Sequence, residues 1–324
     1  IINLKSGGEV LSPWRSPLRY PGGKLKLAPL IEDIVSKYNN NNYVEPFAGG
    51  AGIGIYLLLN KKVKHITLND LDLAIYSFWI SITKYHKKFL KKFDNKEINI
   101  NEWKKQKDIF NNLENKHNLN DFELLDLGFS TFFLNRTNFS GILRGATPVG
   151  GMKQNGKWKI NYEYNKSRLR PLIEEIGKYS NEISVKNIDI ISSKKTFLNL
   201  IENFTDKETL IFIDPPYVNQ GKRLYLPIKS MKEHEIIAKK INKLKTNWVL
   251  TYDSVPDLIN LYDFSNNKYM YTLQYKMKTH RKAVEFLALS NNIDICETSK
   301  IKILKRLALL FENMTNCQFI ASYI

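Results

Sequence analysis

The sequence has few cysteines and no long apolar run. Its 324 residues include two cysteines, Cys296 and Cys317, which stand outside any CxxC or Cys/His cluster and so argue against a disulfide framework and a structural zinc site. No segment approaches the ~18 consecutive apolar residues of a membrane span, and residues 1–6 lack the charged-then-apolar order of a secretory signal. We therefore expect a protein of the reducing cytoplasm that binds neither a metal nor a membrane.

Acidic residues are scarce relative to basic ones. Asp and Glu number 32 against 49 Lys and Arg, which gives a formal net charge of +17. Such a charge favours polyanionic partners, and without a membrane segment it favours nucleic acid. The composition is otherwise that of a globular protein, with 43% hydrophobic and 25% charged residues, which argues against a disordered or fibrous chain. The length allows one large α/β domain or two small ones.

Apolar runs that alternate with turns predict an α/β fold. Residues 43–69 have the pattern of a strand, a glycine-rich turn, a helix and a second strand. Further strand-like runs occupy residues 183–185, 210–213, 248–250 and 285–289. Such units build a sheet with helices on both faces, so we predict a doubly wound, Rossmann-like mixed sheet.

The region between the two groups of strands has a different pattern. Residues 74–179 show amphipathic helical periods and then a stretch rich in Gly and Pro, which predicts a mostly helical insertion that carries a hairpin. The sheet domain would then comprise residues 1–73 and 180–292. Residues 293–324 would form a C-terminal extension of unknown role, with apolar residues at helical spacing between 301 and 311.

A stiff acidic turn follows the predicted strand 210–213. It consists of Asp214, Pro215, Pro216 and Tyr217. An acidic residue at the carboxyl end of a central parallel strand lies where open α/β sheets bind ligands, and the two prolines fix φ and remove two N–H donors. Asp214 and the Pro215 carbonyl could accept both hydrogens of an exocyclic amine, while the Tyr217 ring stacks on the base. The alternative is a proline-rich loop whose Asp caps a turn; the strand before it favours the amine site.

A glycine-rich turn, residues 45–52, follows Tyr43-Val44, which belong to the first predicted strand. Glycines let the backbone pass close to a cofactor, and the helix behind the turn presents its N-terminus to a negative group. The turn is not a phosphate loop, because no Lys-Ser/Thr pair follows it. Asp70 ends the next strand, where an acidic side chain typically holds ribose hydroxyls. Its alternative role is the N-cap of the following helix.

Upstream lies Tyr20-Pro21-Gly22-Gly23-Lys24, in which a flexible turn precedes the cation Lys24. Such an arrangement is suited to hold a carboxylate group. The alternative is a plain loop that enters a helix over residues 25–35.

Basic residues concentrate in the insertion. Residues 135–170 carry eight Lys and Arg side chains and one acid, interleaved with Asn, Ser, Tyr and Trp158. A solvated face is the alternative, but this mixture supplies both phosphate contacts and base-edge donors, so we favour nucleic acid. We expect Asn138 and Arg144 to read bases. The candidate DNA-binding residues are Arg136, Asn138, Ser140, Arg144, Lys153 and Lys157.

Taken in order, these motifs match a known family. Residues 19–24, 45–49, Asp70, 135–141 and 214–217 resemble the Dam-like class of S-adenosylmethionine-dependent adenine-N6 DNA methyltransferases, over most of the chain. The resemblance implies a bacterial or phage-type protein with a pocket in which Tyr20 and Lys24 approach the methionine moiety, Asp70 holds the ribose and Asp189 approaches the adenine ring. The implied cofactor-binding residues are Tyr20, Gly23, Lys24, Glu45, Pro46, Phe47, Ala48, Gly49, Asp70, Asp189 and Asp214.

The resemblance also implies an activity. The protein would flip the target adenine out of double-stranded DNA and methylate its N6 amine at Asp214, Pro215, Pro216 and Tyr217, without a metal. One candidate partner is a cognate restriction endonuclease that acts on the same site, and the biological role stays open between restriction-modification, a phage protein and an orphan regulator. Three alternatives stay open: methylation of cytosine N4, methylation of RNA adenine, and a DNA-binding relative that has lost catalysis.

Two departures from the family pattern concern geometry and target. Ala51 stands where the glycine turn often has Gly, which bears on the shape of the turn. Ser140-Gly141 stands where many members that methylate GATC have Asn-Gly, so we expect a different target sequence.

Overall fold

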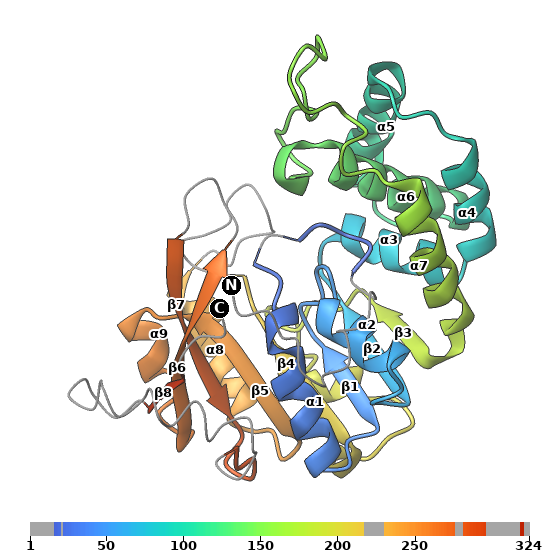
Figure 1. The fold of residues 1–324 in the computed structure, drawn as a ribbon. Helices are drawn as coiled ribbons and strands as arrows, with labels where there is room; N and C mark the ends of the chain where they lie inside the picture. The colour runs from blue at the N-terminus through green and yellow to red at the C-terminus, as the bar shows by residue number, and fades with distance from the viewer. Residues whose placement is uncertain (1–15, 21, 217–229, 276–280, 296–317, 321–324) are drawn as a thin grey trace, which may run out of the picture.

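A single mixed sheet organises the fold. The computed structural model describes residues 16–20, 22–216, 230–275, 281–295 and 318–320. Its eight strands lie in the order β3-β2-β1-β4-β5-β7-β6-β8 (Figure 1). The strands are β1 (Asn42–Glu45), β2 (His65–Asn69), β3 (Ile183–Lys186), β4 (Thr209–Ile213), β5 (Asn247–Asp253), β6 (Asn267–Tyr275), β7 (Arg281–Leu289) and β8 (Gln318–Ile320). Strands β3, β2, β1, β4 and β5 are parallel, whereas β7 is antiparallel to both β5 and β6.

Helices cover both faces of this sheet. The α-helices of the described residues are α1 (Ala28–Lys37), α2 (Gly52–Leu59), α3 (Leu73–Thr83), α4 (His86–Asn95), α5 (Ile100–Leu113), α6 (Asp121–Thr137), α7 (Lys166–Lys178), α8 (Met231–Ile241) and α9 (Pro256–Asn260), of which α1, α2, α3, α8 and α9 cover the sheet. Along β4, Leu210 and Phe212 join the hydrophobic cluster of α1, α2 and α3, whereas Ile211 and Ile213 join that of α8 and α9. This alternation on a fully buried strand confirms the predicted doubly wound sheet.

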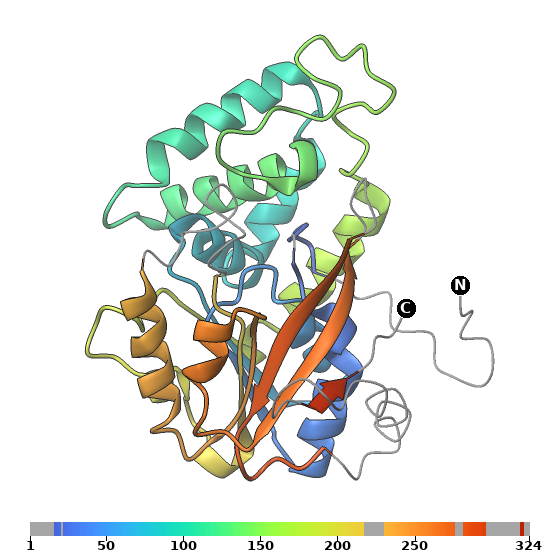
Figure 2. The ribbon, with the colours of Figure 1, turned by 90° about the vertical axis from the view of Figure 1, so that its left-hand side faces the viewer.

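Helices α4 to α7 gather at one end of the molecule, away from β6 and β7 (Figures 1 and 2). Helix α6 begins with a capping box between Asn120 and Glu123 and packs along α3. A Cβ at Gly128 would collide with Ser77 and Ser81, so glycine permits this close approach. Phe78 of α3 stacks on Phe132 of α6 with ring centroids 5.9 Å apart. The predicted helical character of the insertion is confirmed.

The predicted hairpin of the insertion has a different form. In place of two paired strands, residues 138–164 form a short 3₁₀ helix (Phe139–Gly141), turns and one isolated antiparallel bridge, between Asn138 and Pro148. Pro148 has no N–H to extend a ladder, and Gly145, Gly150 and Gly151 all have positive φ, so the backbone turns away from an extended path. The helix expected at residues 301–311 lies outside the described residues. None of the helices in the described part of the chain is both long and apolar enough to cross a membrane.

Candidate active site

The carboxyl ends of four adjacent parallel strands carry the predicted acidic residues. Asp189 follows β3, Asp70 follows β2, Glu45 ends β1 and Asp214 follows β4. Because neighbouring parallel strands end at the same edge of a sheet, the fold places these residues along one edge, where open α/β sheets bind ligands. Within the described ranges, no group of three or more His, Cys, Asp and Glu side chains could hold a metal ion.

Asp214 is held from two sides. The Thr251 hydroxyl, on β5, donates to Asp214 Oδ1 over 2.8 Å, and Lys24 Nζ lies 3.2 Å from Asp214 Oδ2. The Asp214 side chain stays 24% exposed, so its carboxylate is fixed in direction and still accessible. Pro215 is buried and Pro216 half-buried. Tyr217 lies outside the described residues.

Lys24 lies between two carboxylates. Its ammonium is 3.7 Å from Glu285 Oε2 as well as 3.2 Å from Asp214 Oδ2, and it donates to the Gly22 carbonyl over 2.7 Å. The side chains of Lys24 and Glu285 are 3% and 2% exposed. The Tyr271 hydroxyl on β6 donates to Glu285 on β7. Burial of these charges is tolerated because each has an opposite partner.

Sequence reasoning missed Glu285 and Thr251. The available signal was that Glu285 is the only charged residue within the apolar stretch 283–289. Its cationic partner, however, follows only from the placement of β7 and of the loop that carries Lys24.

The glycine turn after β1 packs closely against Tyr20. Gly49 has φ +45°, and a Cβ there would collide with the Tyr20 ring. The Trp79 indole donates to the Gly49 carbonyl over 2.9 Å, which fixes the turn to α3. Ala51 adopts the left-handed conformation, φ 44° and ψ 38°, at the N-cap of α2, so alanine here keeps the geometry that glycine favours.

The remaining residues of the turn are held by the backbone and by β2. The Pro46 carbonyl accepts from the Asn69 side chain over 2.9 Å, and the Ala48 N–H donates to the Asn69 carbonyl over 2.8 Å. Phe47 is partly buried against the cluster of α8 and α9. Upstream, the Gly23 N–H donates to the Tyr20 carbonyl over 3.1 Å, which closes the loop before Lys24.

Glu45 is buried beneath this turn. Its Oε1 accepts from the Gly54 N–H of α2 over 2.9 Å. Desolvation raises the pKa of Glu45 to about 8, although the Gly54 hydrogen bond acts in the opposite direction. Near neutral pH this carboxyl is therefore largely protonated in the ligand-free protein.

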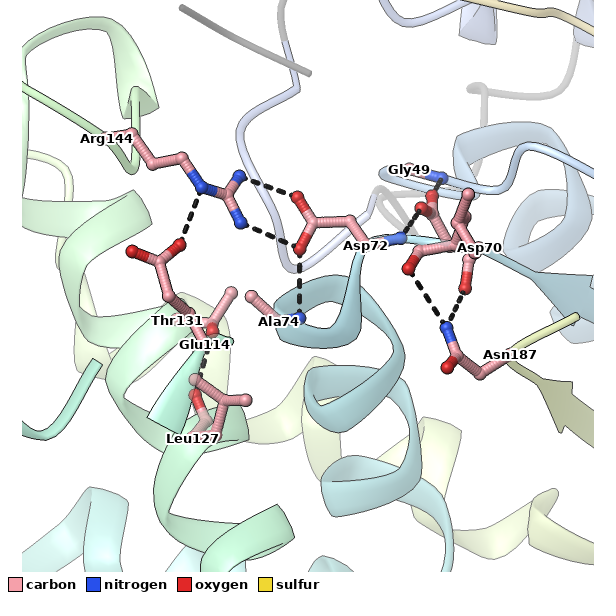
Figure 3. A network of polar contacts seen from close by, with 10 residues as sticks. Gly49, Asp70, Asp72, Ala74, Glu114, Leu127, Thr131, Arg144 and Asn187 are labelled. Atoms are coloured by element: carbon pink, nitrogen blue, oxygen red, sulfur yellow. Dashed lines mark hydrogen bonds and ion pairs between the residues drawn. The ribbon is translucent and has the colours of Figure 1, made fainter. Parts of the chain in front are cut away.

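Asp70 connects the glycine turn to the start of α3 (Figure 3). Its Oδ2 accepts from the Gly49 N–H over 2.8 Å and its Oδ1 from the Asp72 N–H over 2.9 Å. Burial, and then the nearby Asp72 carboxylate, raises the pKa of Asp70 to about 7. Asp72 is the N-cap of α3, because its side chain accepts from the Ala74 N–H over 3.0 Å. The alternative reading of Asp70 as that cap is therefore wrong.

Asp189 orders its own loop. Its Oδ1 accepts from the N–H groups of Ile191 and Ser192 over 2.9 and 2.8 Å. The residue is half-buried at the same sheet edge as Asp70.

Two residues predicted to bind DNA lie in the interior instead. Arg136 and Asn138 are 3% and 1% exposed. Arg136 Nε donates to the Pro17 carbonyl over 2.7 Å. Asn138 accepts from the Trp103 indole and donates to the Ile142 carbonyl, both over 2.7 Å. Their side chains hold backbone and helix together, so their positions argue against the predicted contact with bases.

Neighbouring Asn135 has a similar role. Its side chain accepts from the Arg19 N–H over 2.7 Å and donates to the Arg19 carbonyl over 2.8 Å. This motif of α6 therefore fixes the segment that presents Tyr20.

The other four candidates lie nearer the surface. Ser140 is half-buried with φ 56°, and Arg144 pairs with acidic residues described below. Lys153 and Lys157 are exposed on residues 138–164, the Gly-rich loop of the insertion, with Lys157 Nζ 5.3 Å from the Trp158 ring centroid. The loop thus presents cations beside an exposed aromatic ring.

The mostly parallel mixed sheet, with helices on both faces, is that of a Rossmann-like methyltransferase fold. Residues 20–277 match the profile of the D12 class N6 adenine-specific DNA methyltransferases, and the chain belongs to this family. It is thus an adenine methyltransferase of the DNA-modifying class, which confirms the resemblance of its motifs, and the family implies a methyl donor.

Curated relatives are distant in sequence. Type II methyltransferase M.MjaIII of Methanocaldococcus jannaschii is 22% identical over 209 residues, 62% of this chain and 68% of the relative. Modification methylase StsI of Streptococcus sanguinis is 26% identical over 234 residues, 69% of this chain and 32% of that longer protein. Type II methyltransferase M.CviBI of Paramecium bursaria Chlorella virus NC1A is 20% identical over 273 residues, 82% of this chain and 93% of the relative.

Proposed function

We propose that this protein transfers a methyl group from S-adenosylmethionine to the N6 amine of adenine at a specific site in double-stranded DNA. The observation that carries the proposal is the accessible Asp214 carboxylate at the end of central strand β4, directed by Thr251 and Lys24 and followed by two prolines. It lies one strand away from the glycine turn after β1.

The residues along the sheet edge fit this cofactor by the chemistry of their donors and acceptors. Asp70 offers a carboxylate to the ribose hydroxyls, with each oxygen already oriented by a backbone N–H. Lys24 and the ring of Tyr20 would contact the methionine moiety, and Asp189 the adenine ring. The wall of the pocket would comprise Gly23, Glu45, Pro46, Phe47, Ala48 and Gly49. When bound, the cofactor supplies an electrophilic methyl group on a sulfonium.

Asp214 and Pro215 prepare the acceptor amine in this proposal. The Asp214 carboxylate and the Pro215 carbonyl each accept one N6 hydrogen, which localises on nitrogen a lone pair otherwise delocalised into the ring. Tyr217 stacks on the base and Pro216 stiffens the turn. As the amine lone pair forms the N–CH₃ bond, the sulfonium S–CH₃ bond would break with its electron pair left on sulfur, and the surplus amine proton would pass to the Asp214 carboxylate that already accepts it and then to water. A paired base cannot present its amine to a buried site, so the adenine must leave the duplex first.

The insertion provides recognition in this proposal. Residues 74–179 would form the target-recognition domain, residues 1–73 and 180–292 the catalytic domain, and residues 293–324 an extension. Lys153 and Lys157 are both exposed, Lys157 beside Trp158, and would contact phosphates and bases. The names of the relatives, a modification methylase and two type II methyltransferases, support a role in restriction-modification. In that role the partner would be a cognate endonuclease that acts on the same site.

The test is incubation of the purified protein with methyl-labelled S-adenosylmethionine and plasmid DNA, followed by digestion and nucleoside analysis. We expect label in N6-methyldeoxyadenosine, and none with the Asp214→Ala variant. Label on cytosine, or only in an RNA substrate, would contradict the proposed acceptor. A protein that binds DNA but shows no cofactor binding by calorimetry would be a relative without catalysis.

A further inference from the structure

Arg144 joins the Gly-rich loop of the insertion to two acidic residues at helix ends, Asp72 at the start of α3 and Glu114 at the end of α5 (Figure 3). Its two terminal nitrogens donate to both oxygens of Asp72 over 2.7 and 3.0 Å, and its Nε donates to Glu114 over 2.7 Å. The guanidinium carbon lies 5.6 Å from the centroid of the Phe110 ring. This bidentate geometry uses the planar fork of arginine, which lysine cannot reproduce.

Asp72 continues the contact toward the sheet edge. Its own side chain is 8% exposed and caps α3, while its N–H donates to Asp70 Oδ1. Asp70 in turn accepts from Gly49. A continuous series of hydrogen bonds therefore runs from Arg144 through Asp72 and Asp70 to the glycine turn.

The positive charge of Arg144 offsets the negative charge of Asp72, which lies next to Asp70. Without the Arg144 guanidinium, the buried Asp72 carboxylate would stand next to Asp70, and no other basic side chain among the described residues forms an ion pair with Asp72. Exposed ion pairs contribute little, but here one partner is buried and the contact is bidentate. Removal of the guanidinium would leave two neighbouring carboxylates to repel each other at the proposed ribose site.

We propose that Arg144 is a positioning residue for the cofactor pocket, which holds Asp70 through Asp72 and thereby couples the insertion loop to cofactor binding. The inference rests on the proposed function, because it takes Asp70 as the ribose ligand. A movement of the loop that releases Asp72 would weaken cofactor binding. Because thermodynamic coupling is reciprocal, bound cofactor would favour the loop conformation that holds Asp72 by the same factor.

The experiment measures the Kd of S-adenosylmethionine by calorimetry on DNA-free protein. The variants are Arg144→Ala, Asp72→Asn and the double variant, since Asn keeps an N-cap acceptor for Ala74 but loses the charge that holds Arg144. The matched control is Arg170→Ala, which removes an exposed arginine of α7 that also pairs with two acids, Asp94 of α4 and Glu174 of α7.

We expect Arg144→Ala to weaken cofactor binding about fivefold or more, the lower end of typical coupling between sites, with Arg170→Ala unchanged. In the Asp72→Asn background, Arg144→Ala should have little further effect, because both changes break one contact. In steady-state assays, the KM for the cofactor should rise while kcat at saturating cofactor stays within about twofold.

Three results would overturn this inference. They are an Arg144→Ala Kd within about twofold of the parent, effects of the two substitutions that simply add, and a fall in kcat that excess cofactor does not restore. A change confined to the preferred DNA sequence would make Arg144 a base reader alone. If the parent protein itself binds no cofactor, the proposed function fails, and that result is distinct from all of these.

Discussion

Lys24 and Asp214 form an ion pair across the candidate active site, with Lys24 Nζ 3.2 Å from Asp214 Oδ2. Lys24 belongs to the loop before α1, and Asp214 follows the central strand β4. The pair places a buried cation next to the carboxylate that we propose accepts a hydrogen bond from the substrate amine. Because the same ammonium also lies 3.7 Å from Glu285 Oε2, the direction of Asp214 depends on strands β4, β5 and β7 together.

Replacement of Asp214 by Ala should abolish methyl transfer and leave the fold intact. The acceptor of the amine is lost, but the buried apolar residues of β4 before it are unchanged. Loss of one preorganised polar contact at a reacting group typically costs about 10²–10³ in kcat. Single-turnover methylation assays measure the loss, with Asp263→Ala as a control for an exposed acidic residue. Turnover within a few-fold of the parent would refute the role of Asp214.

Replacement of Lys24 by Met should destabilise the protein. The substitution leaves Glu285 buried at 2% exposure without the ammonium beside it, and breaking a buried ion pair typically costs about 3–5 kcal/mol. The double variant Lys24→Met with Glu285→Gln should recover part of that loss, since no unpaired charge remains at position 285. Urea unfolding gives the free energies. Equal stability of the single and double variants would show that Glu285 does not depend on Lys24.

Substitution of Arg136 by Met should lower stability without changing the preferred DNA sequence. The variant leaves the Pro17 carbonyl without its buried donor, and an unsatisfied buried group typically costs about 1–3 kcal/mol. In contrast, Lys153→Ala on the exposed loop should weaken DNA binding and leave the melting temperature unchanged. Thermal melts and binding to cognate and random duplexes separate the two. If Arg136→Met changed the preferred DNA sequence, Arg136 would contact bases, as predicted from the sequence.

The ligand-free protein should lose stability as the pH rises from about 5 to 9. The folded chain raises the pKa of Asp70 to about 7 and that of Glu45 to about 8, so both carboxyls bind a proton more tightly in the folded than in the unfolded chain. Their contribution is complete below the unfolded pKa values of about 4 and is lost as the pH rises through the folded values.

The control for this pH dependence is Glu45→Gln, which keeps an oxygen acceptor for the Gly54 N–H but cannot ionise. The variant should lose less stability than the parent between pH 5 and 9, by on the order of a few kcal/mol. Urea unfolding at several pH values gives the comparison. Parallel stability curves for the variant and the parent would contradict the raised pKa of Glu45.

Much of the sheet and its functional edge could be predicted from the sequence. Strands β1, β2, β4 and β5 are short apolar runs bounded by turns, and the carboxyl ends of β1, β2 and β4 are marked by Glu45, Asp70 and Asp214. Because parallel strands share an edge, local pattern alone brings these residues together. Family membership could also be predicted, because the motifs are short local patterns that stand in the family's order along the sequence.

Contacts that depend on long-range placement could not be predicted. Glu285 meets Lys24 only because β7 enters the sheet beside β5, and no local pattern encodes that order. Strand β6 was missed because its Tyr, Lys and Thr residues gave no continuous apolar run. The roles of Arg136 and Asn138 were misjudged because a basic or polar side chain in a Gly-rich context looks exposed until the helices around it are placed.

The hydrogen bonds between Asn135 and the Arg19 backbone, which join residues 116 positions apart, have a consequence for how the chain folds. The segment that carries Tyr20 is anchored by α6, so it cannot reach its final position until the insertion has formed and docked. Contacts of such long sequence separation close large loops and form late. A refolding chain should therefore regain its secondary structure first and its capacity to bind the cofactor last.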